Sequence, residues 1–169
     1  MEVFEAIKTM LAVRDYQQKP VPDEIITQIV EAGRLTGSAM NRQQWDFVVV
    51  RQAETLQRLG QLATNGPYIA KAALAIAIVV ADGPLGYIDG TRAVQDMMLT
   101  AWAAGIGSNW VGNVNHTPIK ELLAIPQDRM VLTIIPFGYP TPKVGAGRKK
   151  RKALAEVAHA ENFAQPFSG

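Results

Sequence analysis

Cysteine is absent from the sequence, and histidine occurs only as His116 and His159. Without cysteine the chain has no disulfide, no thiolate nucleophile and no cysteine-based metal site, and two histidines do not make a histidine-rich metal centre. The sequence also lacks a G-x-S-x-G elbow and an H-E-x-x-H motif. These absences argue against the common classes of hydrolase.

Long apolar runs are absent too. None approaches the roughly 18 to 20 residues needed to span a bilayer, and Met1–Thr9 lacks the layout of a signal peptide. The 169 residues are 48% hydrophobic and 19% charged, which is typical of one ordinary globular domain. We therefore predict a single domain over residues 1–169, a cytoplasmic location and no membrane partner.

Acidic residues are missing from one basic stretch near the C-terminus. Six of the 17 basic residues lie between Lys143 and Lys152, with no acid among them. The run GRKKRK suits phosphate or nucleic acid but is also typical of a solvated surface. No aromatic residue lies between Tyr139 and Phe163 to stack on bases, so we expect no nucleic-acid partner, although that class stays an alternative. The segment 143–169 is predicted to be a basic extension of the domain.

A dinucleotide-binding fingerprint is not present either. The G-x-G formed by Gly145 and Gly147 has Lys150 where the third glycine would stand, and no βαβ pattern surrounds it. A separate nicotinamide-binding half is therefore not expected.

Apolar periodicity predicts helices on both faces of a mixed sheet of four to five strands, a three-layer α/β/α arrangement of the α+β class. The runs 74–81 and 131–137 are apolar without alternation, as in strands covered on both faces. Pro136 indicates that its strand is at an edge or nearly finished. The predicted helices span residues 2–11, 23–33, 56–62, 88–104 and 118–123, and the predicted strands 45–51, 74–81, 108–111 and 131–137.

Two predicted helical segments carry an extensive apolar surface. In the first helix Val3, Ala6, Ile7 and Met10 recur at helical spacing and are predicted to form a buried stripe. In the longest helix the half from 97 to 104 is apolar almost all round. It must be enclosed by its own sheet or by a second subunit.

The stretch 34–50 concentrates amide and hydroxyl groups between a helix and a strand. Its polar side chains are Ser38, Asn41, Arg42, Gln43 and Gln44. A carboxamide offers donors and an acceptor, so such a segment suits the edge of a planar, hydrogen-bonding ligand. The alternative is a loop whose polar residues cap the neighbouring elements.

The order apolar helix, Ser-x-x-Asn-x-Gln-x-Trp, hydrophobic strand resembles the first flavin-binding segment of the nitroreductase family. Further segments that are similar to that family are VFEAIKTMLAVRDYQQKPVPDEII, AAGIGSNWVG, FGYPTPK and RKKRK. The family usually has proline in place of Gly37 and Gln44 of this chain. The resemblance implies a nitroreductase-like fold, a homodimer with shared flavin sites, and flavin mononucleotide (FMN) as cofactor.

The resemblance also implies where the FMN phosphate binds. Arg14 would hold it from the end of the first helix, and Lys149 and Arg151 from the basic segment, as a dianion removed from water requires. The family usually has arginine and serine where this chain has Met10 and Ala12. Two expected phosphate ligands are thus missing.

Five other residues match family positions near the flavin. Ser38 and Asn41 would touch it from the partner subunit, and Asn65 would meet the pyrimidine edge. Backbone amides at Gly112 and Asn113 would lie near the reactive part of the ring, where a hydrogen-bond donor is useful. A plain turn is the other interpretation of Gly112.

The implied activity is that of an FMN-dependent oxidoreductase. NAD(P)H would give hydride to the flavin and leave, and a quinone or nitroaromatic acceptor would take its place in a ping-pong reaction. No side-chain acid or base is then required, because the cofactor carries the chemistry. The alternative is a flavin-binding or storage protein of the same fold without efficient turnover, which the missing phosphate ligands favour.

Overall fold

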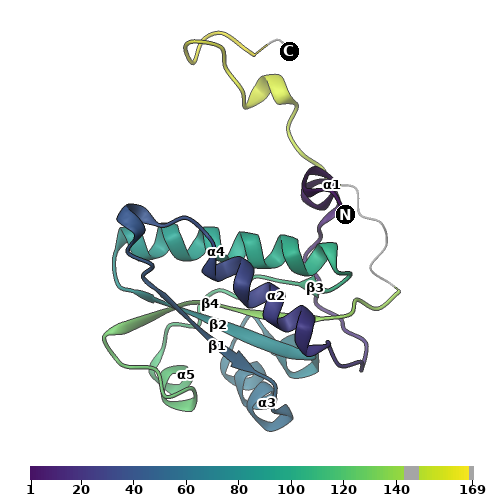
Figure 1. Ribbon diagram of the computed structural model, residues 1–169, viewed down its shortest axis with the longest axis vertical. Coiled ribbons are helices and arrows are strands. Elements are labelled where there is room, and N and C mark those ends of the chain that lie inside the picture. The colour runs from purple at the N-terminus through teal and green to yellow at the C-terminus, as the bar shows by residue number, and fades with distance from the viewer. Residues whose placement is uncertain (143–148, 168–169) are drawn as a thin grey trace.

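The computed structural model describes residues 1–142 and 149–167; the Gly145 and Gly147 motif and part of the basic run lie outside them. A four-stranded sheet carries helices on both faces (Figure 1). The elements are, in chain order, α1 (Val3–Thr9), α2 (Asp23–Arg34), η1 (Ala39–Asn41), β1 (Trp45–Val50), α3 (Ala53–Leu62), η2 (Pro67–Lys71), β2 (Leu74–Ala81), α4 (Pro84–Ala103), β3 (Gly107–Ser108), α5 (Thr117–Leu122), β4 (Arg129–Gly138) and η3 (Leu154–Glu156).

The strand order is β1-β2-β4-β3, and all three ladders are antiparallel. The predicted mixed character of the sheet is wrong for these ladders, and the parallel pairing between Ala12 and Ser108 is an isolated bridge outside the named strands. The predicted strand 108–111 is wrong in extent, because β3 ends at Ser108 and Val111 makes its own bridge to Ile134. Because β4 is an interior strand, Pro136 marks the approach to its end and not an edge.

The apolar run of β2 separates two hydrophobic cores. One set of side chains packs with α2 and α4, and the alternate set packs with α3 and α5. Successive residues of a strand point to opposite faces, so a strand buried on both faces has no polar positions. The first set is Leu74, Ile76, Ile78 and Val80, and the second is Ala75, Ala77 and Val79.

The longest helix, α4, crosses one face of the sheet beside α2. It starts at Pro84 and not at the predicted residue 88, because proline is favoured in the first turn of a helix. Gly33 of α2 packs directly on the Met97 side chain, since a Cβ there would lie 2.2 Å from the Met97 methyl group. Met97 and Ala101 are buried, whereas Ala103 is exposed. The predicted enclosure of this half-helix is thus incomplete within one chain.

The first helix, α1, lies near the C-terminal end of α4 (Figure 1). The prediction that it buries its apolar stripe is wrong for the single chain. Ala6 is buried, but Val3 is 70% exposed and Ile7 is 45% exposed. The periodicity of a helix identifies an apolar face without identifying what covers it.

The C-terminal segment leaves the body of the molecule next to α1 and ends well away from the sheet (Figure 1). It folds back on itself, with a bridge between His159 and Pro166 and a stacked pair of rings, His159 and Phe163. Among residues 1–142 and 149–167, no helix combines the length and the apolar character needed to cross a membrane.

Candidate functional site

Arg14 is held at the end of the sheet by the residue before it. Val13 is fully buried, and its backbone N–H donates to the Ser108 carbonyl at 2.9 Å. Ala12 forms the parallel bridge to the same serine. This short extended segment leaves the Arg14 side chain exposed, so its guanidinium is accessible to an anion.

The Arg14 guanidinium lies over the ring of Tyr68, 6.0 Å from the ring centroid. The Tyr68 hydroxyl accepts a hydrogen bond from Asn109 Nδ2, which also donates to the Trp110 carbonyl at 2.9 Å. Asn109 is only 4% exposed, so this chain of contacts is anchored in the protein. Sequence reasoning missed both Tyr68 and Asn109. A tyrosine directly after the Asn-Gly-Pro turn was the available signal for one, and nothing local indicated the other.

The turn that contains Asn65 lies against the loop after β3. A Cβ on Gly66 would come within 2.5 Å of a Val111 methyl, so the two segments are in close contact. Asn65 itself is exposed. Because Tyr68 and Asn109 join the same two segments, Asn65 and the loop of Val111 share one end of the sheet with Arg14.

Gly112 and Asn113 follow Val111 in this loop. The nearest atom that a Cβ on Gly112 would meet is Trp110 Nε1 at 3.7 Å, so its backbone can be approached closely. Asn113 has a left-handed backbone with φ of 58° and an exposed side chain. Non-glycine residues adopt this conformation infrequently, mostly in turns. The loop therefore lies at the surface, with an open approach to the backbone at Gly112.

Ser38 and Asn41 lie near the other end of α4. The backbone N–H of Ala39 donates to the Asp89 carboxylate near the start of that helix. Near its end, Trp102 Nε1 donates to the Thr9 hydroxyl at 2.9 Å, next to the segment that carries Arg14. The helical rise between Asp89 and Trp102 amounts to about 20 Å. One chain thus does not bring Ser38 and Asn41 together with Arg14.

Lys149 lies against α1. Its ammonium donates to the Ile7 carbonyl near the end of that helix, where a cation is favourable. Burial, and then the neighbouring Arg151, lower the pKa of Lys149 below its usual value. Arg151 is exposed, and its guanidinium donates to the Lys150 carbonyl at 2.9 Å. The structure connects Lys149 to α1 and not to Arg14, so the phosphate roles of Lys149 and Arg151 stay predictions.

The two positions that depart from the family pattern differ in environment. The Met10 side chain is half-buried and packs against the core shared by α2 and α4. Ala12 is exposed beside Arg14. The packing of Met10 accounts for an apolar residue there, whereas nothing in the structure requires alanine at position 12.

The residues at this end of the sheet fit FMN. Arg14 supplies an accessible cation for a phosphate, and Asn65 with the Gly112 loop supplies amide groups for the edge of a planar ring. These groups belong to segments that contact one another. The fit needs no rearrangement of a buried charge.

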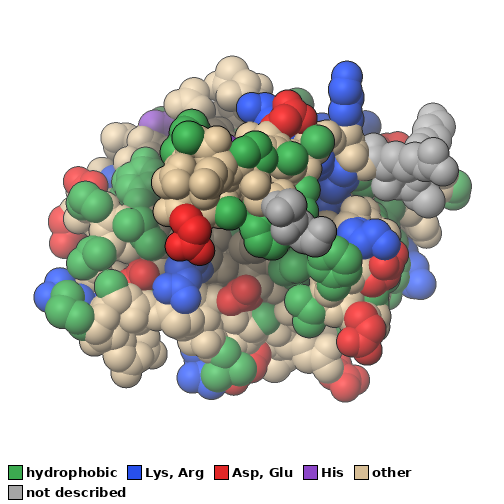
Figure 2. Space-filling view, turned by 90° about the horizontal axis from the view of Figure 1, so that it is seen from above, with side chains coloured by type: hydrophobic (Ala, Val, Ile, Leu, Met, Phe, Trp, Pro, Cys, Tyr) green, Lys and Arg blue, Asp and Glu red, His purple; other side chains and the backbone are tan. Residues whose placement is uncertain are grey.

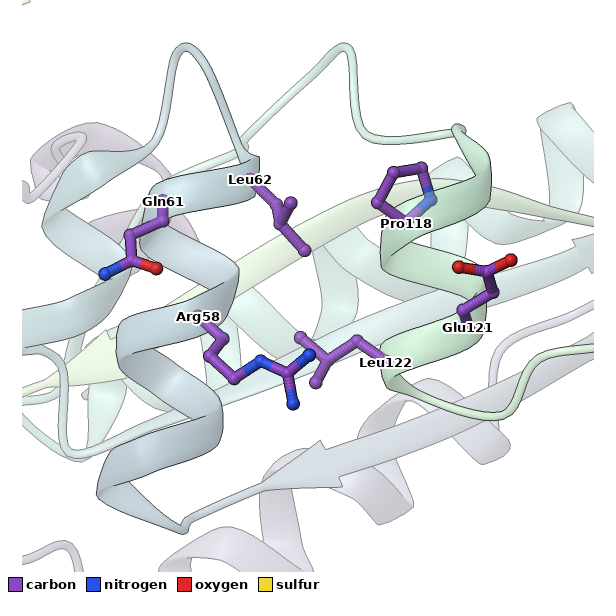
Figure 3. A pocket seen from close by; sticks show the side chains of 6 residues that line it. All are labelled: Arg58, Gln61, Leu62, Pro118, Glu121 and Leu122. Carbon is purple, nitrogen blue, oxygen red and sulfur yellow. The ribbon is translucent and has the colours of Figure 1, made fainter.

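A surface cavity of about 350 Å³ lies elsewhere, between α3 and α5 (Figure 3). Arg58 and Leu122 reach into it from the two helices. These helices cover the face of the sheet opposite α4, and none of the predicted flavin residues lines this cavity. Its lining residues are Arg58, Gln61, Leu62, Pro118, Glu121 and Leu122.

Comparison with known proteins agrees with the fold. The profile of the nitroreductase family matches residues 9–85 and 81–139. A protein of Methanothermobacter thermautotrophicus, with the provisional name NADH dehydrogenase/NAD(P)H nitroreductase, is 34% identical over 86% of this chain and 81% of its own length. An FMN reductase [NAD(P)H] of Bacillus subtilis is 25% identical over 95% of this chain and 74% of its own length.

Solved structures lead to the same family. An FMN-dependent nitroreductase of Clostridium difficile superposes with a TM-score of 0.83 and 26% identity, covering 95% of this chain and 99% of that one. The fold is therefore that of an oxidoreductase with helices on both faces of one sheet. The chain belongs to the nitroreductase family, and is thus an enzyme of the NAD(P)H-dependent oxidoreductase class.

Proposed function

We propose that this protein is an FMN-dependent oxidoreductase that takes hydride from NAD(P)H. The observation that carries the proposal is the grouping of Arg14, Asn65 and the Gly112 loop at one end of the sheet. An exposed cation and several amide groups on one surface suit a ligand that has both a phosphate and a planar, hydrogen-bonding ring. The names of the relatives in Bacillus subtilis and Clostridium difficile support the same cofactor.

The protein's own groups bind and orient. Arg14 holds the phosphate, with Tyr68 limiting the directions in which its guanidinium points. Asn65 meets the polar edge of the ring, and backbone amides at Gly112 and Asn113 donate to its reactive part. Bound FMN supplies the redox chemistry, so no side chain has to act as acid or base.

In this proposal the electron donor and the electron acceptor bind in turn at the same site beside the flavin. NAD(P)H binds first and leaves, and a quinone or nitroaromatic acceptor then binds, because the sequence contains no separate dinucleotide fingerprint. Steady-state reduction of a simple quinone should then give parallel double-reciprocal lines. Intersecting lines would mean that both substrates are bound together.

The active form in this proposal is a homodimer. Hydrophobic side chains are spread over the face of the molecule seen in Figure 2. Neighbouring exposed apolar residues, as on α1, form the kind of contiguous patch that marks an interaction site. The chain exposes large apolar residues on α1, on the loop after α2, at the start of α4 and on the C-terminal segment. They are Val3, Phe4, Ile7, Leu35, Met40, Tyr87, Ile88, Leu154, Val157, Phe163 and Phe167.

A dimer also gives Ser38 and Asn41 a ligand to contact. They lie about the length of α4 away from Arg14 of their own chain. In the proposed assembly each chain places them against the FMN that is held by Arg14 of its partner. Each of the two sites is then incomplete without the other chain.

The experiment that tests this function is an FMN titration of the purified protein, followed through the visible absorption of oxidised flavin. Arg14→Ala should weaken binding at least about tenfold, because a charge-assisted hydrogen bond is lost. Arg58→Ala, in the cavity between α3 and α5, removes the same charge elsewhere and should leave the affinity unchanged. A wild-type protein that does not bind FMN would overturn the proposal.

A second candidate is a flavin-binding or storage protein of the same fold. The apolar Met10 and the missing hydroxyl at Ala12 favour it, since they leave fewer groups for the phosphate. Bound FMN that neither NADH nor NADPH reduces would support storage over turnover.

A further inference from the structure

The loop that carries Ser38 and Asn41 has an unusual backbone. Met40, Asn41 and Gln43 all have positive φ, at 51°, 54° and 49°. This conformation is unfavourable for side chains other than glycine, and it persists where surrounding contacts enforce it, often at ligand-binding segments. Within the loop, the Gln43 backbone N–H donates to Ser38 Oγ at 3.0 Å, and Gln43 Nε2 donates to the Asn41 carbonyl at 3.3 Å.

Three side chains on one face of α4 contact this loop from outside. Asp89 is 1% exposed, and its two carboxylate oxygens lie 3.2 and 3.0 Å from the Ala39 backbone nitrogen, which donates to them. One residue earlier in the chain is Ser38, and two residues later is Asn41. The buried carboxylate therefore fixes the backbone at the centre of the segment that the proposed function places against FMN.

Two more side chains of α4 extend this contact along the same face. Asp96 accepts a hydrogen bond from the Thr36 hydroxyl. The Arg92 guanidinium lies so close to Gly37 that a Cβ there would be 3.0 Å from Nη2. Residues three and seven positions apart lie on one side of a helix, so Asp89, Arg92 and Asp96 form a single polar row under the loop.

Burying a carboxylate costs free energy, and few carboxylates are fully buried without a specific partner. The partner of Asp89 is the backbone N–H of Ala39, in a loop where Met40, Asn41 and Gln43 have positive φ. An apolar residue at this buried helix position would leave the Ala39 N–H without the Asp89 acceptor.

We propose that Asp89 is a positioning residue for the flavin site of the partner subunit. It fixes the loop so that Ser38 and Asn41 point at the FMN held by Arg14 of the other chain, and Asp96 supports it through Thr36. This role rests on the proposed function above. Asp89 itself contacts neither cofactor nor substrate.

The first arm of the test measures FMN affinity. Asp89→Asn keeps the shape and removes the charge, so the hydrogen bond to Ala39 weakens and FMN should bind about tenfold less tightly. Asp128→Asn is the matched control, because Asp128 is exposed in the turn before β4, and it should bind like wild type. Unchanged affinity in folded Asp89→Asn protein would overturn the proposal.

The second arm separates positioning from a structural role and uses FMN stoichiometry as its readout. Two variants are co-expressed with different tags, and mixed dimers are isolated. The mixed dimer of Asp89→Asn and Arg14→Ala chains should contain one intact site and bind up to half of the wild-type amount of FMN. The mixed dimer of Asp89→Asn and Asn41→Ala chains should contain no intact site, because each site then receives its Ser38 and Asn41 loop from an altered chain. Equal loss in the two pairings would show a merely structural role.

Two further comparisons complete the test. If Asp89→Asn does not fold, Asp96→Asn takes its place, and it should show a smaller loss with the same pairing pattern. Failure of Arg14→Ala and Asn41→Ala to complement each other would overturn the shared site of the proposed function, and this proposal with it. If Arg14→Ala is complemented by Asn41→Ala but not by Asp89→Asn, only the role of Asp89 is overturned.

Discussion

The Tyr68 hydroxyl accepts a hydrogen bond from the buried Asn109, and the ring of the same tyrosine lies under the Arg14 guanidinium at 6.0 Å. These two contacts link the exposed Arg14 side chain, through Tyr68, to the buried Asn109. Arginine loses rotamer freedom when it binds an anion, so a surface that already restricts it favours binding.

The ring of Tyr68 should therefore matter more than its hydroxyl. We expect Tyr68→Leu to lower FMN affinity about two- to fivefold, which corresponds to an exposed cation–π contact of roughly 0.5 to 1 kcal/mol. Tyr68→Phe keeps the ring and should stay within about twofold of wild type. Isothermal titration with FMN measures both, and equal losses would show that the ring does not orient Arg14.

Position 12 offers a way to strengthen the site. Ala12 is exposed next to Arg14, where the family usually has a hydroxyl. Ala12→Thr should tighten FMN binding by up to about tenfold, because a hydroxyl can donate to the phosphate. Ala12→Val has the same shape without the hydroxyl and should give no gain. Identical affinities for the two variants would mean that the phosphate does not lie at this position.

Stability at alkaline pH should depend on Tyr16. Burial, the largest cause, and the neighbouring Tyr68 raise the pKa of Tyr16 well above the usual value of 10.0. The folded state therefore keeps a proton that the unfolded state releases above about pH 10, so the free energy of unfolding falls as pH rises through that range. The slope contributed by one group is at most about 1.4 kcal/mol per pH unit.

The matched variant for this measurement is Tyr16→Phe. It loses the hydrogen bond to the Val13 carbonyl, 2.7 Å away, and should be less stable at neutral pH by about 1 kcal/mol. Above pH 10 its stability should fall less steeply than that of wild type. Urea denaturation between pH 8 and pH 11 measures both effects. Parallel curves would assign the alkaline loss to other groups.

The dimer should depend on the exposed face of α1. Ile7 is 45% exposed there, and Ile7→Glu would place a charge in the proposed interface. We expect this variant to be monomeric by light scattering and to lose FMN from both sites at once, because each site needs two chains. Val49→Glu is the control, since Val49 of β1 is 38% exposed on another element. A flavin-loaded monomer would contradict the shared site.

The sequence by itself determined most of the fold. The apolar run 74–81 predicted β2 with its bounds, because a short β-branched run without polar positions is typical of a strand covered on both faces. The predicted helix starting at Asp23 and the strand starting at Trp45 are confirmed, since their periodicity and flanking residues agree. Pairing partners have no such local signal, and the antiparallel ladders followed only from the structure.

For the site, the sequence determined the residue types and the tertiary structure decided their grouping. Motif order in the chain indicated Arg14, Ser38 and Asn41 but carried no distance between them. The position of α4 between the two groups decided that they belong to different ends of one chain. Buried partners such as Asn109 and Asp89 could not be predicted, because a hydrogen bond between residues distant in sequence depends on how helices and strands pack, and a single sequence does not encode that contact in any local pattern.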